Sequence, residues 1–386
     1  MRDVVVVGAG PAGLMAAREL ARRGHDVVAL EEHASIGLPA HCTGILGFEA
    51  FAELDIPRDT ILSTARSARF IAPDGSSVLV DTDRVNAAIV DRARFDQTLA
   101  DSSRAAGVEL RNNARVRSIE VHDRGVDVSA DGGAAITARA CVLACGASYR
   151  FNRELGLGAP RAFVQSAQLE RPFQGPAQVE VHLGRDRAPG GFAWVVPFER
   201  DGQSCQRLGL MADARAGTLF RKFAEDVRSR FAPGDDAWPD PRLKILPLGP
   251  VARTYANRVV AVGDAAGLVK PTTGGGIYYG LLSGSFAAET LDGALRADDL
   301  RETALRAYES RWRERLGAEI RIGLAFRTLA SRLNDRAIDA LIELARIDGI
   351  VPMLRQTADF NWHRQSALAL LKHAQFRRIL LSSLWN

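Results

Sequence analysis

The stretch Gly8-Ala9-Gly10-Pro11-Ala12-Gly13 follows directly on the apolar run Val4–Val7 and opens an Ala- and Leu-rich stretch that ends near Arg23. A second apolar run starts after Asp26 and ends at Glu31, 18 residues after Gly13. A strand, a glycine turn, a helix, and a second strand that ends in an acidic residue form a parallel βαβ unit. This order predicts a site for the pyrophosphate of a dinucleotide.

Each glycine of this turn has a predicted role. The first permits the tight turn, the second lets the backbone approach the pyrophosphate, and the third lets the helix pack close to the sheet. The start of the helix adds free N–H groups and a positive dipole. The predicted cofactor-binding residues of the turn are Gly8, Gly10, Pro11, Ala12 and Gly13. Those at the end of the second strand are Glu31, for the ribose, and its neighbour Glu32.

A second motif separates FAD from NAD. Gly263-Asp264-Ala265-Ala266-Gly267 ends the apolar run Val259–Val262, about 250 residues after the first turn. An acidic side chain there can hold the ribityl and ribose hydroxyls of a flavin, and a nicotinamide site needs none so far along the chain. A helix start at the flavin pyrimidine edge would favour the negative charge of reduced flavin. We therefore predict FAD, with Gly263, Asp264, Gly274, Gly275 and Gly276 at this end.

Length and composition narrow the class of protein. A chain of 386 residues that is 47% hydrophobic and 25% charged predicts two or three packed domains. The net charge of +4 is too small to indicate nucleic-acid binding, and residues 301–386, with fifteen basic and nine acidic side chains, carry the basic excess. Four scattered cysteines without a CxxC pair predict neither a disulfide framework nor a metal site. No signal peptide or membrane-spanning segment is expected.

The spacing of apolar residues along the chain divides it into three regions. Residues 1–159 with 251–298 predict a Rossmann-type α/β domain that binds FAD, and 160–250, with alternating strands, predict an inserted antiparallel sheet domain for the substrate. Residues 299–386 have helical spacing throughout and predict a helical C-terminal region. The strands expected in the inserted domain are Gln178–Leu183, Phe192–Phe198 and Arg207–Met211.

On these motifs the chain resembles the geranylgeranyl reductases, a branch of the para-hydroxybenzoate hydroxylase type of FAD enzymes. The resemblance covers most of residues 1–290. Its further segments are Gly37-Leu38-Pro39 through Cys42-Thr43-Gly44, Asp91-Arg92-Ala93-Arg94-Phe95-Asp96, Pro189 to Pro197, and Tyr278-Tyr279 after the three glycines. It implies a reductase that saturates carbon–carbon double bonds of an isoprenoid chain in a lipid, quinone or pigment tail.

The resemblance also implies roles for single residues. Arg92 would reach the flavin linker region, and a polyprenyl chain would lie in a tunnel lined by the strand at Pro189–Pro197. The substrate residues expected there and beside the three glycines are Phe192, Trp194 and Tyr278. The chain departs from the family's PxxYxWxFP motif at Phe192, in place of Tyr, and at Val196, in place of Phe.

Cys42 is the candidate catalytic residue. Reduction of an alkene needs a weak acid near the flavin that protonates one carbon while hydride reaches the other, and in this superfamily the loop that holds Cys42 approaches the flavin. The alternative is a small buried hydrophobic residue. His41 is a second possible acid, whereas Cys141 and Cys145 lie in an apolar strand and are expected in the core.

Other functions stay open on the sequence. The main alternative is an FAD-dependent monooxygenase acting on a hydrophobic small molecule, although the aromatic hydroxylases usually have His where this chain has Gly267. A halogenase lacks support, because Phe192 replaces the first tryptophan of the usual pair. A non-enzymatic membrane-surface protein rests only on the basic tail.

The chain has one GxGxxG after a strand, so the electron donor is expected to be transient NAD(P)H or ferredoxin. We expect a cytoplasmic protein, with residues 365–386 either touching the inner face of the membrane or forming a packed C-terminal helix.

Overall fold

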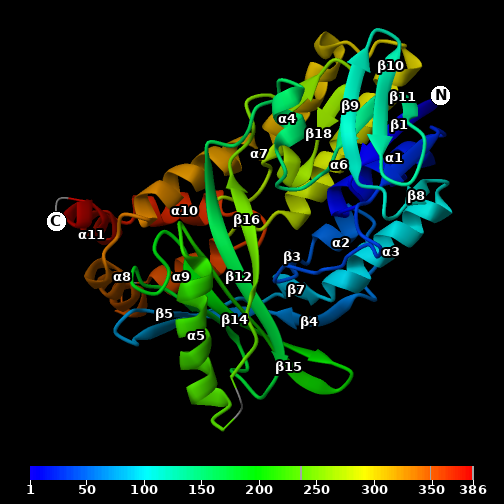
Figure 1. The fold of residues 1–386 in the computed structure, drawn as a ribbon. Coiled ribbons are helices and arrows are strands. Elements are labelled where there is room, and N and C mark those ends of the chain that lie inside the picture. The colour runs from blue at the N-terminus through cyan, green and yellow to red at the C-terminus, as the bar shows by residue number, and fades with distance from the viewer. Residues whose placement is uncertain (235–236, 348, 385–386) are drawn as a thin grey trace.

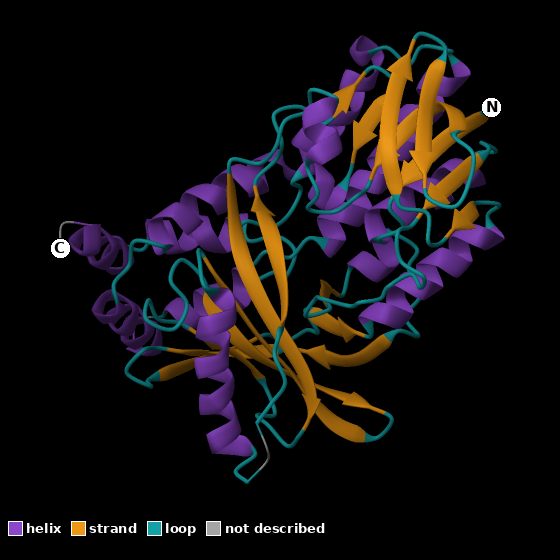
Figure 2. Cartoon of the chain, in the orientation of Figure 1, coloured by secondary structure: helices purple, strands orange, loops and turns teal. Residues whose placement is uncertain are grey.

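The computed structural model describes residues 1–234, 237–347 and 349–384. They form two lobes (Figure 1): a sheet with helices around it holds the N-terminus, and a second sheet with the C-terminal helices forms the other lobe. Figure 2 shows the long strands of the second lobe and the helices beside them. The predicted α/β class is confirmed.

The first sheet is built around β1, which pairs in parallel with β2 and β11. The central strands are buried apart from the first two residues of β1 and from Thr137 and Arg139 of β11, as expected of a parallel sheet covered on both faces. Its strands in order are β17 (Tyr255–Ala256), β18 (Val259–Ala261), β11 (Ile136–Leu143), β1 (Arg2–Val7), β2 (Val27–Leu30) and β8 (Glu109–Arg111), with the hairpin β9 (Val116–His122) and β10 (Gly125–Ala130) paired to β11.

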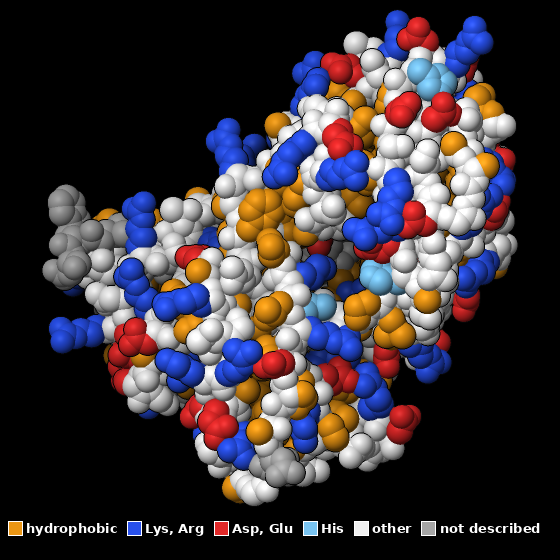
Figure 3. Space-filling model, viewed as in Figure 1, with side chains coloured by type: hydrophobic (Ala, Val, Ile, Leu, Met, Phe, Trp, Pro, Cys, Tyr) orange, Lys and Arg blue, Asp and Glu red, His pale blue; other side chains and the backbone are white. Residues whose placement is uncertain are grey.

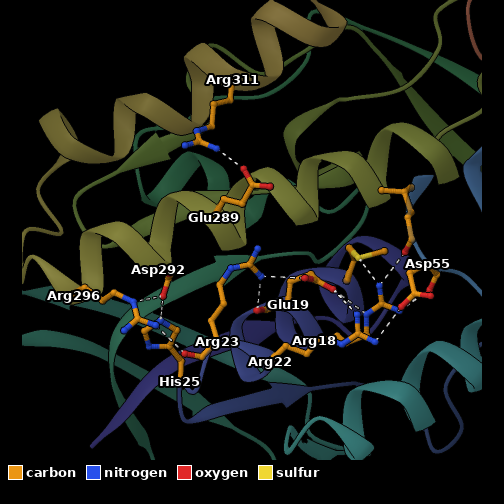
Figure 4. Close-up of polar contacts among 12 residues, drawn as sticks. Arg18, Glu19, Arg22, Arg23, His25, Asp55, Glu289, Asp292, Arg296 and Arg311 are labelled. Atoms are coloured by element: carbon orange, nitrogen blue, oxygen red, sulfur yellow. Dashed lines mark hydrogen bonds and ion pairs between the residues drawn. The ribbon is translucent and has the colours of Figure 1, made fainter. Parts of the chain in front are cut away.

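Helix α1 (Pro11–Arg22) packs between α3 (Arg92–Ala105) and α6 (Ile277–Arg296). Its buried Arg18 donates to the carbonyls of Leu54 and Asp55, at the end of α2 (Ala50–Glu53), at 3.0 and 3.1 Å. Figure 4 shows this contact beside those of α6 with the residues that follow α1, where Arg296 donates to the Arg23 carbonyl and His25 contacts Asp292. It also shows the ion pair of Arg311, on α7 (Glu302–Ala330), with Glu289 on α6. These contacts fix the helix that starts at the glycine turn.

The second sheet takes strands from two distant parts of the chain. Its order is β16 (Arg242–Leu248), β12 (Ala162–Pro172), β15 (Gln203–Ala212), β14 (Phe192–Arg200), β13 (Val179–His182), β5 (Ser67–Ile71) and β6 (Ser77–Asp81). Residues 67–81 were assigned to the FAD-binding domain in the sequence analysis, but β5 pairs in parallel with β13 and extends this sheet. The sheet is therefore mixed rather than wholly antiparallel. Helix α5 (Ala216–Phe231) covers one face.

Between the two large sheets lies a three-stranded sheet, β3 (Ile45–Gly47), β7 (Ala87–Val90) and β4 (Ile61–Ala65). Helix α4 (Arg150–Glu154) follows β11, and the C-terminal helices are α7 (Glu302–Ala330), α8 (Asp335–Ile347), α9 (Ile350–Thr357), α10 (Arg364–Lys372) and α11 (Ala374–Leu384). Within the described parts of the chain, no helix combines the length and hydrophobicity that crossing a bilayer requires.

Helix α7 packs on α6, β17 and β18 of the first lobe, whereas α8 and α9 pack on β6 of the second lobe. Phe376 and Leu380 are buried with α8 and β6, whereas Leu368 and Leu381 stay exposed. Of the tail residues considered for lipid contact, Trp385 lies outside the described residues.

Candidate active site

A cavity of about 670 Å³ lies between the two lobes. On the face shown in Figure 3 the surface is hollowed between the lobes, and hydrophobic side chains gather beside β12 and β16. Of the predicted site residues, the cavity wall contains Gly10, Pro11, Ala12, Cys42, Arg92, Phe192, Trp194, Gly263, Asp264, Gly274, Gly275 and Gly276. Gly8, Gly13, Glu31, Glu32 and Tyr278 lie behind it or outside it.

The three glycines of the turn after β1 differ in the space around them. A Cβ on Gly8 would lie 2.4 Å from the carbonyl oxygen of Ala144, and one on Gly13 would lie 2.1 Å from that of Gly8. A Cβ on Gly10 would meet no atom within 4 Å and would point into open space. Gly8 and Gly13 are thus needed for backbone packing, while Gly10 leaves room for a ligand at the start of α1.

The two acids after β2 differ in environment. The Glu31 carboxylate accepts hydrogen bonds from the backbone N–H of Ala9, at 3.0 Å, and of His33, at 3.1 Å, so it braces the glycine turn. Glu32 is half exposed and pairs with Arg115 at 3.4 Å. The structure brings only Glu31 to the turn.

Arg92 opens α3 beside the cavity. The side chain of Asp91 caps this helix, and Arg92 donates to both oxygens of Asp96 at 2.7 Å. Burial opposes the charged guanidinium, but Asp96 and the Cys42 thiol outweigh it and raise the pKa of Arg92. Its Nε is buried and has no partner among the described residues. The site therefore holds a fixed positive charge with one donor free.

The loop of Cys42 is held by the second sheet. Gln168 on β12 donates to the Cys42 carbonyl at 3.0 Å and accepts from the Thr43 hydroxyl at 3.1 Å. The buried Arg207 on β15 donates to the Thr43 carbonyl at 2.8 Å and pairs with Glu170 at 2.6 Å. These bonds fix the backbone of the loop, and the Gly44 N–H donates to the Cys42 thiol at 3.4 Å in the cavity wall.

His41 turns toward β16. Its ring Nε2 lies 2.9 Å from the Arg242 carbonyl, and burial lowers the pKa of the imidazole. Of the predicted core cysteines, Cys141 is fully buried, while Cys145 is partly exposed and its thiol donates to the Ser148 carbonyl at 3.3 Å. Among the described residues, no three His, Cys, Asp or Glu side chains are grouped to hold a metal.

The second motif forms the opposite wall. Asp264 lies in the 3-10 turn η1 (Gly263–Ala266), and one of its oxygens is 3.5 Å from the Lys244 ammonium. The following glycines are crowded from behind: a Cβ on Gly275 would lie 2.7 Å from Lys270 Cε, and one on Gly276 would lie 2.7 Å from Asp264 Oδ1. Helix α6 starts directly after them, so its N-terminus faces the cavity.

The rest of the wall is apolar and comes from one face of the second sheet. Alternate residues of β13 and β14, among them Phe192 and Trp194, face the cavity, with the two rings 5.6 Å apart. Gly209 makes room for Trp194, since a Cβ there would lie 2.1 Å from the indole. Tyr278 is only 1% exposed and its hydroxyl donates to Glu53, so the structure places it behind the wall.

Part of the wall was missed by the sequence analysis. The segment between α9 and α10, with the end of α9 and the first turn of α10, contributes Leu354, Ala358, Asp359, Phe360, His363 and Ser366. These residues lie about 80 to 90 positions after the three glycines they approach, and they form no recognisable motif. Helical spacing from residue 300 onward gave no sign that a loop there reaches the cavity.

Comparison with known proteins gives relatives over the whole chain. Residues 3–200 match the family model described as lycopene cyclase protein. Two proteins of Methanopyrus kandleri named digeranylgeranylglycerophospholipid reductase are 30% and 31% identical over 370 residues, covering 92% of this chain and 92% and 96% of theirs. A protein of the same name from Methanococcoides burtonii is 29% identical over 357 residues, covering 88% of this chain and 86% of that protein.

Solved structures support the fold. A geranylgeranyl bacteriochlorophyll reductase-like protein from Thermoplasma acidophilum superposes with a TM-score of 0.83 at 22% identity, over 99% of each chain. A variant of the halogenase PltM in complex with FAD gives a TM-score of 0.70 at 16% identity, over 100% of this chain and 91% of that one.

Proposed function

The chain belongs to the digeranylgeranylglycerophospholipid reductase family, a geranylgeranyl reductase group of FAD-dependent oxidoreductases, and its first half also fits the lycopene cyclase model. From this premise we propose that it saturates carbon–carbon double bonds of an isoprenoid chain. The observation that carries the proposal is a single cavity that joins the glycine turn of a dinucleotide site to an apolar sheet face. The monooxygenase alternative has less support, because the full-length relatives are named reductases.

The residues present fit FAD. The open space at Gly10 suits a pyrophosphate at the start of α1, and Glu31 stands at the ribose position. The buried Nε of Arg92 has no hydrogen-bond partner among the described residues, so this N–H would donate to the linker region of the cofactor. Asp264 would hold the ribityl hydroxyls, and the bare backbone of Gly274–Gly276 would meet the isoalloxazine edge.

The bound cofactor, once reduced, supplies a hydride to one alkene carbon. The chain supplies the rest of the reaction. Phe192, Trp194 and their apolar neighbours hold the isoprenoid chain and exclude water. The Cys42 thiol gives its proton to the other alkene carbon, and the Arg92 guanidinium stabilises the thiolate until water returns the proton.

Three features extend the proposal. The electron donor would be transient NAD(P)H or a ferredoxin, which would supply the electrons that the bound cofactor needs. Residues 1–159 with 251–298 form the FAD-binding domain, 160–250 the substrate domain and 299–386 the helical C-terminal region. Strands β5 and β6 join the sheet of the substrate domain. Contact with the inner face of the membrane would use the exposed Leu368 and Leu381 beside basic side chains of α10 and α11.

An anaerobic single-turnover assay tests the function. Protein loaded with FAD and reduced with dithionite is mixed with a geranylgeranyl lipid, and flavin absorbance and product mass are followed. We expect reoxidation of the flavin and a gain of two hydrogens per turnover without oxygen. No anaerobic reaction with any isoprenoid tried, or a product that carries an oxygen atom from O₂ in a parallel aerobic reaction, would replace the reductase with the monooxygenase.

A further inference from the structure

Lys270 stands where the second motif meets the C-terminal segment. It begins the loop that leads to the three glycines, and this loop closes on it: the Lys270 N–H donates to the Gly275 carbonyl at 3.1 Å, and the Gly274 N–H donates to the Lys270 carbonyl at 2.8 Å. The side chain is only 3% exposed. A buried lysine directly behind the wall of a cofactor site needs a reason beyond packing, because burying a charge is costly.

The ammonium is held by the C-terminal segment. Lys270 Nζ donates to the Phe360 carbonyl at 2.8 Å and to Asn361 Oδ1 at 3.3 Å, and it lies 4.1 Å from the centre of the Phe360 ring. Asn361 in turn donates to Glu49 at 2.7 Å. No carboxylate of the described residues forms an ion pair with Nζ. The amine is therefore solvated by neutral groups, and its charge is not cancelled by a direct partner.

The charge lies against the loop that would meet the flavin. A Cβ on Gly275 would be 2.7 Å from Lys270 Cε and 3.3 Å from Nζ, so the side chain runs directly behind the glycine backbone. The other titratable groups that act on Nζ are Glu49, before α2, Asp359, in the C-terminal segment, and Cys42, in the loop after β2. His363 lies close enough for the lysine charge to lower its own pKa.

The presence of lysine rather than arginine at position 270 also bears on the role of this side chain. Only four of the 50 basic residues are lysines, so this chain uses arginine at nearly every basic position. Arginine cannot lose its proton in a protein, whereas lysine can when it is buried. Burial lowers the pKa of Lys270 to about 7, against the opposing effect of Glu49 and Asp359. Near neutral pH this amine can therefore respond to a change of charge beside it.

We propose that Lys270 is a further residue of the flavin site, whose ammonium behind Gly274–Gly276 stabilises the negative charge that reduced flavin carries at its pyrimidine edge. The inference rests on the proposed FAD site. It follows that reduction of the flavin favours the protonated amine and that the protonated amine favours reduction by the same free energy. The C-terminal segment, which lines the cavity and holds Nζ, then takes part in setting the flavin's reduction potential.

The first test is the midpoint potential of the FAD-loaded protein, measured anaerobically against a reference dye. Lys270→Met and Lys270→Gln should each lower the ratio of reduced to oxidised flavin at a fixed potential by about tenfold, which is about 30 mV for a two-electron couple. Gln keeps a donor for the Phe360 carbonyl, so a purely structural role would leave its potential unchanged, and that result would overturn the proposal. Lys222→Met, at an exposed position of α5, is the matched control and should not change the potential.

The second test needs no substitution. Protein carrying ¹³Cε-labelled lysine has four lysine signals, and the buried one should titrate near pH 7 with oxidised flavin. Reduction of the flavin should raise the titration midpoint of this amine by about one pH unit. Flavin reduction and amine protonation favour each other by the same tenfold factor, so the shift seen at the amine matches the shift seen at the flavin. An unchanged midpoint in protein that binds FAD and reduces an isoprenoid would refute this inference alone. Failure to bind FAD would refute the proposed function instead.

Discussion

The turn after β1 and the loop before α6 are both glycine-rich, but different neighbours require their glycines. In the turn, a Cβ on Gly8 would strike the carbonyl of Ala144, directly after β11, and a Cβ on Gly13 would strike the carbonyl of Gly8 in the turn itself. In the loop, a Cβ on Gly274 or Gly275 would strike the side chains of Leu246 or Lys270, which come from β16 and from the loop itself. The turn is therefore fixed by backbone packing, and the loop by side chains that arrive from several elements.

The largest expected effect tests the turn. Gly10→Val should abolish FAD binding because its side chain fills the open space of the pyrophosphate, while the free energy of unfolding changes by no more than about 0.5 kcal/mol. Gly13→Val should instead lower stability by more than about 3 kcal/mol, since its Cβ would overlap the Gly8 carbonyl. Flavin absorbance and thermal unfolding separate the two results. If both variants lost the same free energy of unfolding, Gly10 would be needed for packing as much as Gly13, and the distinction between the two glycines would be wrong.

The Cys42 loop, which lies between the two glycine segments, gives the next effect. Cys42→Ser should slow the alkene step by about 10²- to 10⁴-fold and leave flavin reduction unchanged, because a proton donor acts only when substrate is present. Stopped-flow absorbance follows both steps. Cys145→Ser is the matched control, since its thiol points to the Ser148 carbonyl. A change below about threefold in Cys42→Ser would remove this thiol from the mechanism.

Asp264 tests the side chains that support the second loop. Asp264→Ala should weaken FAD binding by about 1.5–3 kcal/mol, roughly tenfold to a hundredfold, through loss of hydrogen bonds to a charged acceptor. Asp264→Asn keeps the shape beside Gly276 and should lose less affinity. Fluorescence titration of the apoprotein gives both constants. Wild-type affinity in the alanine variant would place the ribityl chain elsewhere.

A smaller effect concerns pH and the C-terminal segment. The His363 Nδ1 accepts from the Thr272 hydroxyl at 2.5 Å and its Nε2 donates to the Phe360 carbonyl at 3.0 Å, which fits the neutral ring. Burial lowers the pKa of His363 from 6.5 to about 3. The unfolded chain therefore binds the extra proton between these values, and stability from this group falls as pH drops from 6.5 toward 3. His363→Gln should show a shallower loss of melting temperature over that range, and an equal slope would contradict the assignment.

The difference between a turn fixed by its own backbone and a loop fixed by side chains from several elements also explains which features the sequence could predict. The first turn lies in one βαβ unit, so the spacing of Gly8, Gly13 and Glu31 was enough to locate it. Strands β12 and β16 were not predicted; in β16 apolar side chains lie on both faces, since Leu246 faces the cavity while Leu243 and Ile245 are exposed, so the polar and apolar residues do not alternate. Neighbours that come from the far end of the chain, such as Phe360 behind Lys270, leave no local pattern.

The smallest effect separates two adjacent acids at the end of β2. Glu31 braces the Ala9 N–H at 3.0 Å, so Glu31→Ala should lose both this hydrogen bond and the ribose contact. Glu32 is half exposed and pairs only with Arg115 at 3.4 Å among the described residues, and exposed pairs of this kind contribute about 0–1 kcal/mol to stability. Glu32→Ala should thus change FAD affinity by less than about twofold, which is within about 0.5 kcal/mol. Titration of the two variants side by side measures the difference. A loss of affinity in Glu32→Ala as large as that in Glu31→Ala would mean that the adenosine end lies further from the turn than its backbone packing indicates.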